Sequence, residues 1–169
     1  MIRRTTKLLF VVSALLALSA CANMDTDPRL LAGSSQSADV LSAYGQPVRS
    51  WPDADGGKTL EYSSQPFGET CYMVKLGADG RVISVENTLA LAPRSRVVAG
   101  FTPDQVSRLL GKERSRTSFK LSAEDVWDWT IRPDQTGYGM RFNVHFKDGL
   151  VARTSYSMVF PDDGLLFGR

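Results

Sequence analysis

The sequence predicts an α+β protein of two tandem units, each a short helix followed by a three-stranded antiparallel sheet, with the helices on one sheet face. Three observations support this class. Sequence segments recur at nearly constant spacing, each unit opens with helix start and stop residues, and each unit then alternates apolar and polar residues around an Asp-Gly turn. We expect a first repeat at 37–88 and a second at 101–160, joined by a linker at 89–100.

Matching residues recur in the same order in the two repeats, at offsets of 66 to 70 residues. The aligned pairs are Val40 with Val106, Gly45 with Gly111, "LEY" at 60–62 with "WDW" at 127–129, and "YMVKL" at 72–76 with "FNVHF" at 142–146. A constant order at a nearly constant offset indicates a duplicated unit.

Each repeat opens with the residues that begin and end a helix. In the second, Thr102 is the N-cap, Pro103 suits the first helical position, Gln105 completes a capping box and Gly111 ends the helix. An apolar stripe at helical spacing should face a sheet. The stripe residues are Val106, Leu109 and Leu110 in the second helix, and Val40, Leu41 and Tyr44 in the first, which Ser37 caps and Gly45 ends.

The remainder of each repeat predicts strands. Phe142, Val144 and Phe146 alternate with polar residues, and Asp148-Gly149 predicts a hairpin turn into a strand at 150–156. The first repeat has the same plan around Asp79-Gly80, and the aromatic segments near Tyr62 and Trp127 supply one strand before each hairpin. The stretch 115–120, "SRTSFK", is predicted as a solvated loop.

Residues 1–20 predict a secretory signal, because a basic start precedes an apolar run that closes on small residues. A transmembrane anchor is disfavoured, since the run at 8–20 is shorter than the roughly 20 residues needed to span a bilayer. "LSAC" at 18–21 resembles the lipobox of bacterial lipoproteins. The resemblance implies that Cys21 carries lipid, including acyl chains such as palmitate. No aspartate follows Cys21, which in that family implies an outer-membrane, periplasm-facing location.

Two segments outside the repeats are predicted from composition. Residues 21–36 are rich in small and polar residues and are expected to form a flexible tether. The tail, 161–169, either tucks into the sheet or docks on another protein. Without 1–20 the chain has 17 basic and 18 acidic residues, so charge does not favour a nucleic-acid partner. Cys71 is expected to be a small apolar strand residue, with a reactive thiol as the alternative.

The second repeat, "GFTPDQVSRLLG" followed by "VWDW" and "FNVHFKDGLV", resembles the SmpA/OmlA (BamE) family of outer-membrane lipoproteins. The first repeat departs from this pattern at Tyr62, where tryptophan is preferred. Tandem units of this kind are also similar to the beta-lactamase-inhibitor-protein fold. These resemblances imply a non-catalytic binding or scaffold module for outer-membrane assembly or envelope integrity, with envelope proteins as partners. The alternative is an inhibitor of a periplasmic or secreted hydrolase.

The sequence does not favour an enzyme. His145 falls on the polar side of its strand, where we expect a solvated side chain without an orienting partner. Gly-x-Ser-x-Gly and Ser-x-x-Lys motifs are absent, and Gly137-Tyr138-Gly139 predicts a loop and not a nucleotide cradle. No cofactor, metal or small-molecule substrate is implied.

Aromatic residues are the candidates for partner binding. Trp51 and Tyr138 are expected in loops, next to Pro or Gly. Trp127 and Trp129 share one side of a strand, where packing against the helix stripe is the alternative to partner binding.

Overall fold

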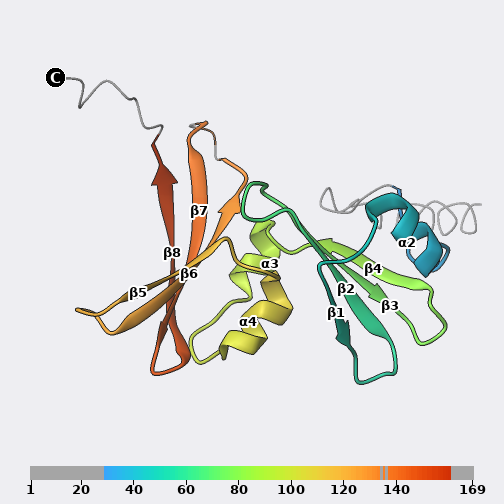
Figure 1. The fold of residues 1–169 in the computed structure, drawn as a ribbon, viewed down its shortest axis with the longest axis horizontal. Coiled ribbons are helices and arrows are strands. Elements are labelled where there is room, and N and C mark those ends of the chain that lie inside the picture. The colour runs from blue at the N-terminus through green and yellow to red at the C-terminus, as the bar shows by residue number, and fades with distance from the viewer. Residues whose placement is uncertain (1–28, 134, 136, 161–169) are drawn as a thin grey trace, which may run out of the picture.

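The computed structural model describes residues 29–133, 135 and 137–160. The chain forms two antiparallel sheets of four strands, and in each sheet consecutive strands are neighbours (Figure 1). This architecture confirms the α+β class. It corrects the strand count, because each predicted three-stranded sheet has a fourth strand at its edge.

The helices and strands follow one another in the order helix, sheet, helix, helix, sheet. The first sheet follows α2 (Ser37–Tyr44) and contains β1 (Arg49–Pro52), β2 (Lys58–Ser63), β3 (Cys71–Leu76) and β4 (Val82–Asn87). The second sheet follows α4 (Pro103–Leu110) and contains β5 (Ser115–Phe119), β6 (Glu124–Ile131), β7 (Gly139–Lys147) and β8 (Leu150–Val159). A short helix, α3 (Leu91–Ser95), occupies the predicted linker.

The two unpredicted strands, β1 and β5, lie at sheet edges. β5 occupies the stretch that was expected to be a solvated loop. Neither strand has a fully buried residue, so neither shows the apolar alternation from which a strand is recognised. Their pairing with β2 and β6 is carried by the backbone.

The ends of α4 are formed as predicted. The hydroxyl of Thr102 accepts from the amide of Gln105 at 3.3 Å, and the Gln105 side chain accepts from the Thr102 amide at 2.8 Å. The first helix differs, because Gln36 and not Ser37 is its N-cap residue, and its amide donates to Asp39 at 2.8 Å. One predicted stripe residue of α2, Leu41, is exposed.

Equivalent hydrogen bonds support the internal duplication. The hydroxyl of Tyr62 donates to the carbonyl of Gly45 at 3.2 Å, and the indole N–H of Trp129 donates to the carbonyl of Gly111 at 3.2 Å. The two glycines end α2 and α4 with φ of 75° and 78°, which favours glycine. The departure at Tyr62 therefore preserves the donor that tryptophan supplies in the second repeat.

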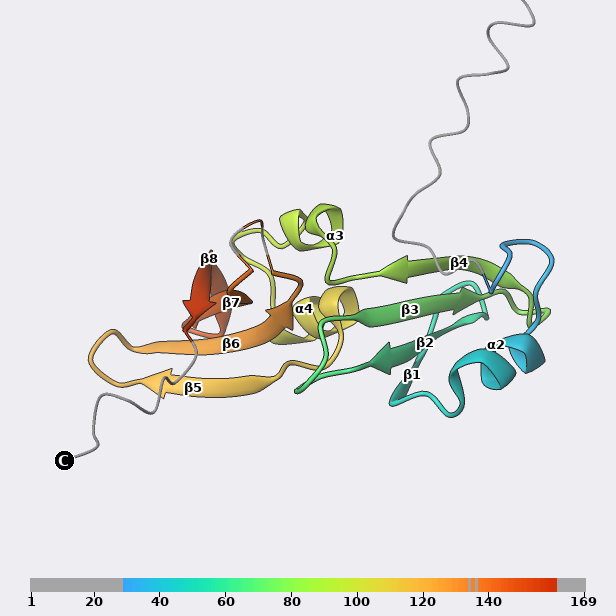
Figure 2. The same cartoon turned by 90° about the horizontal axis from the view of Figure 1, so that it is seen from above.

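The helices are not arranged on one sheet face as predicted. α2 covers one face of the first sheet, whereas α3 and α4 lie between the two sheets (Figures 1 and 2). Val106 and Leu110 of α4 share a core with residues of both sheets, including Met73 and Phe142. A second, smaller core lies under α2 around Val40.

Part of the predicted tether belongs to the folded unit. Leu30 is buried, and the amide of Gly33 donates to the carbonyl of Val82 at 2.8 Å. Gln36 forms an isolated bridge with Arg81. The predicted signal at 1–20, Cys21 and the tail at 161–169 lie outside the described residues. Among the described helices, none has the length and hydropathy to cross a membrane.

Candidate functional site

Trp51 lies in the edge strand β1 and not in a loop as predicted. Its half-buried ring contacts two guanidinium groups, and the central carbons of Arg49 and Arg108 are 4.7 and 4.8 Å from the ring centroid. The indole N–H donates to the carboxylate of Glu61 at 3.1 Å. These contacts link the first sheet to α4.

Trp127 and Trp129 pack in the core, which corrects their selection as partner contacts in favour of the packing alternative. Trp129 is fully buried, because its strand face turns toward α4. Trp127 is 8% exposed, and the guanidinium carbon of Arg116 lies 3.9 Å from its ring centroid. Neither indole is available as an exposed anchor.

Tyr138 keeps an exposed ring, with its centroid 5.5 Å from that of Phe160. Its role in partner binding stays a prediction. Cys71 is fully buried, and burial, followed by the charge of Glu61, raises the pKa of its thiol to about 12. A thiol with this pKa stays protonated near neutral pH, so Cys71 is a packing residue.

His145 is not a solvated side chain, in contrast to the prediction. It lies on the outer face of the second sheet with 12% of its side chain exposed. Its Nδ1 is 3.0 Å from a carboxylate oxygen of Glu124, and its Nε2 is 2.8 Å from the hydroxyl oxygen of Ser155. Arg153 contacts both His145 and Glu124. One of its nitrogens is 3.2 Å from Nε2 of His145, and another donates to Glu124 at 3.0 Å. An orienting carboxylate is therefore within reach.

This arrangement, the outer-face network of Glu124, His145, Arg153 and Ser155, places a hydroxyl, an imidazole and a carboxylate in the order that activates a serine nucleophile. It lies on an open sheet surface, and Arg153 occupies the side of the imidazole that faces Ser155. Hydrogen bonds from His145 and then from Arg153 lower the pKa of Glu124, so the carboxylate is charged near neutral pH. The network is a continuous polar surface across β6, β7 and β8.

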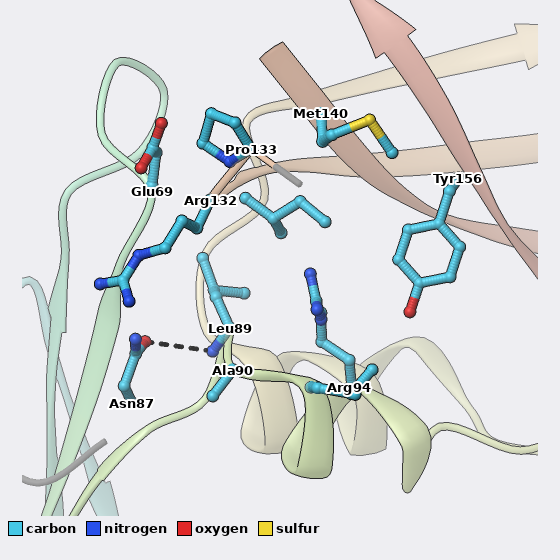
Figure 3. A pocket seen from close by; sticks show the side chains of 11 residues that line it. Glu69, Asn87, Leu89, Ala90, Arg94, Arg132, Pro133, Met140 and Tyr156 are labelled. Atoms are coloured by element: carbon cyan, nitrogen blue, oxygen red, sulfur yellow. Dashed lines mark hydrogen bonds between the residues drawn. The ribbon is translucent and has the colours of Figure 1, made fainter. Parts of the chain in front are cut away.

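A recess opens at the junction of the two repeats (Figure 3). It lies on the face of the second sheet opposite the outer-face network. We call it the junction recess. Its volume is about 410 Å³, within the range of ligand pockets. Its walls come from the turn before β3, the end of β4, α3 and the strands β6 to β8. Its polar lining consists of Glu69, Asn87, Arg94, Arg132 and Tyr156.

The short helix α3 places Arg94 in this recess. Pro93 is buried and anchors the helix, while the guanidinium of Arg94 extends toward Tyr156 (Figure 3). The guanidinium carbon lies 5.5 Å from the ring centroid of Tyr156 and 5.9 Å from that of Phe142. Its Nε is buried without a hydrogen-bond partner among the described residues. Burial lowers the pKa of Arg94, because a charged group is less stable away from water.

The wall that the end of β4 contributes is held by side-chain hydrogen bonds. The carbonyl oxygen of the Asn87 side chain accepts from the amide of Leu89 at 3.2 Å, the dashed line in Figure 3, and from the amide of Cys71 at 3.3 Å. The hydroxyl of Thr88 donates to the carbonyl of Leu110 at 3.0 Å. These bonds tie the end of β4, which forms one wall of the recess, to β3 and α4.

Two further charges lie at the mouth of the recess. The side chain of Arg132 extends toward Asn87, and Glu69 lies on the neighbouring turn (Figure 3). Within the described part of the chain, neither Arg132 nor Glu69 forms an ion pair. The sequence does not predict this site, because its residues come from both repeats and from the predicted linker, and no local pattern brings them together.

Comparisons with known proteins give one structural likeness. No family model and no curated protein matches the sequence, so the resemblance to the SmpA/OmlA family finds no support there. A solved structure from Streptococcus mutans, of a candidate beta-lactamase inhibitor protein, matches 79% of this chain and 88% of its own chain. The identity is 13% and the TM-score 0.31, values at which the likeness carries no argument about function.

Proposed function

We propose that this chain is a periplasm-facing outer-membrane lipoprotein, anchored through Cys21, that acts as a non-catalytic binding or scaffold module in outer-membrane assembly or envelope integrity. The lipobox-like "LSAC" stretch supports the anchor. The observation that carries the binding role is the junction recess, in which a half-buried cation, Arg94, faces a cavity of about 410 Å³. Unsatisfied polar groups in a concave site favour the binding of a complementary partner.

The anchor is tested by mass spectrometry of the protein isolated from membranes. The wild type should be cut before Cys21 and carry lipid, whereas Cys21→Ser should remain an uncut precursor without lipid. A wild-type protein that is processed normally but lacks lipid would contradict the anchor.

The binding role is tested by photocrosslinking in intact cells. A photoreactive residue in place of Leu91, which lines the recess and is 68% exposed, should give specific adducts. The control is Leu121, a fully exposed side chain in the turn between β5 and β6, at the other end of β6 from the recess. Equal adducts from both positions would remove the recess from the proposal.

The identity of the adducts separates the proposal from its alternative. Outer-membrane assembly proteins support the scaffold role. A soluble hydrolase, inhibited by the purified protein, supports an inhibitor instead.

The non-catalytic part of the proposal depends on the outer-face network. A fluorophosphonate probe, which labels activated serines, should leave Ser155 unmodified. Labelling of Ser155 that is lost in His145→Ala would show that the network activates its hydroxyl. The protein would then be an enzyme.

A further inference from the structure

We propose that the junction recess binds a small amphipathic monoanion, a single anionic head group on a short aliphatic body. The inference rests on the proposed role of the recess as a binding site. It goes beyond that role by naming the chemistry of the ligand.

The first argument is the state of Arg94. A guanidinium has five N–H donors in a planar fork that matches a carboxylate or phosphate. Among the described residues, the guanidinium of Arg94 contacts two aromatic rings and has no carboxylate or carbonyl acceptor. Its Nε is buried without a hydrogen bond. A half-buried cation left in this state is unfavourable until an anion reaches it.

The second argument is the charge around the recess. Arg94 and Arg132 supply two positive charges and Glu69 supplies one negative charge, so the described residues of the lining carry a net charge of +1. One anionic group balances this lining. The hydroxyl of Tyr156 and the side-chain amide of Asn87 lie on the same walls and can donate further hydrogen bonds (Figure 3).

The third argument is the apolar part of the walls. Leu89, Leu91, Ile131 and Met140 line the recess together with the polar groups. A ligand that is only a small ion would leave this surface in contact with water. An aliphatic body would cover it, at about 25 cal/mol for each Å² removed from water.

The test is a titration of the purified full chain with three six-carbon compounds. Binding is measured by isothermal calorimetry and by NMR shifts of residues around α3. Hexanoate and hexanesulfonate, which are both monoanions near neutral pH, carry the proposed chemistry and differ in head group, so the tighter of the two identifies the head group that the site prefers. Hexanamide has the same body without the charge. Both anions should bind more tightly than hexanamide, and equal binding of all three would overturn the proposal.

Arg94→Met is the decisive variant, because it keeps an unbranched apolar stem and removes the guanidinium with its charge. Loss of a charge-assisted hydrogen bond should weaken hexanoate binding at least about tenfold. Arg96→Met is the matched control, since Arg96 lies two residues further on, is exposed and is paired with Glu86 at 2.7 Å. Equal weakening by both variants, or by neither, would contradict the role of Arg94.

Stability gives a second readout that is independent of the ligand. Because Arg94 lacks an acceptor in the free protein, Arg94→Met should melt at the same temperature as the wild type or higher. Unfolding of this variant would show that the cation has a structural partner, and the proposal would fail. Arg94→Lys keeps the charge and should retain part of the affinity for hexanoate.

The outcomes distinguish this inference from the proposed function. Crosslinks from the Leu91 position without binding of either anion would leave the binding role and remove the ligand class. Binding of hexanoate without such crosslinks would keep the ligand class and remove the proposed partner contact.

Discussion

The two sheets have the same strand order, but the face of the first sheet turned away from α2 and the face of the second sheet turned away from α4 have different surroundings. In the first sheet, Cys71 and Met73 of β3 point away from α2 and enter the core shared with α4. The equivalent residues of β7, Arg141 and Asn143, lie on the outer face of the second sheet, which no described element covers. The second sheet is therefore packed on one face. The first sheet is packed on one face and also on the part of the other face that holds Cys71 and Met73, whereas Lys75 further along β3 stays exposed.

The burial patterns of the two strands follow from this difference. β3 has four buried residues among its six, including the consecutive pair Met73 and Val74. Along β7, buried residues alternate strictly with half-buried ones, and the buried residues are Phe142, Val144 and Phe146. A strand covered on both faces loses its alternation, whereas a strand covered on one face keeps it. The corresponding strand face thus packs against α4 in the first sheet and forms an open polar surface in the second.

The largest expected effect is an exchange between the equivalent positions Met73 and Asn143. Met73→Asn places an amide in the core beside α4 and should lower the free energy of unfolding by about 3–5 kcal/mol. Asn143→Met removes a part-buried hydrogen bond to Ser155 and an exposed one to Ser157, and should cost about 1 kcal/mol or less. Urea titrations of both variants would measure the difference, and similar losses would contradict the two-faced packing of the first sheet.

The second comparison concerns the glycines that end α2 and α4. Alanine at Gly45 meets no atom within 4 Å and should cost about 1–3 kcal/mol from backbone strain alone. Alanine at Gly111 is strained in the same way, and its Cβ would also lie 2.4 Å from the Cys71 sulfur. Overpacking should add about 1–3 kcal/mol to the loss in stability.

A double-mutant cycle isolates this added cost. Cys71→Ala removes the sulfur, so it should relieve part of the penalty of Gly111→Ala and leave that of Gly45→Ala unchanged. The absence of any coupling between positions 71 and 111 would show that the end of α4 does not pack against β3 in solution.

The comparison also shows what the sequence could predict. The start and end of α4 and the alternation of β7 depend on residues close together in the chain, and both are confirmed. Met73 and Glu61 are buried at 7% and 0% exposure, which was missed because it depends on α4 packing against a face that an isolated repeat would expose. The partner of His145 was missed for a different reason. Glu124 lies 21 residues away on the neighbouring strand of the same sheet, and only the register of the two strands brings the side chains together.

A smaller effect is expected for His145 and its equivalent in the first sheet, Lys75. Lys75 forms an exposed ion pair with Asp55 at 3.0 Å, and exposed pairs add little to stability because water screens them. His145 is more buried and bonds two side chains. His145→Ala should therefore cost about 1 kcal/mol, more than Lys75→Ala, when both are measured by chemical denaturation. An equal or smaller loss for His145→Ala would return this residue to the solvated state that the sequence predicts.

The smallest expected effect is the pH dependence of the ion pairs that these two equivalent residues form. His145 and Arg153 lower the pKa of Glu124, and Lys75 lowers that of Asp55. A carboxylate whose folded-state pKa is lowered stabilises the fold at pH values above its ordinary pKa, and this contribution is lost as the pH falls through the folded-state value. The stability difference between wild type and Glu124→Gln should therefore be larger at about pH 6 than at about pH 3. Asp55→Asn should show the same trend with a smaller amplitude, because its pair is more exposed and better screened by water. A stability difference for Glu124→Gln that does not change with pH would show that Glu124 does not hold its charge against His145 and Arg153, and the outer-face network would then not form in solution as it does in the structure.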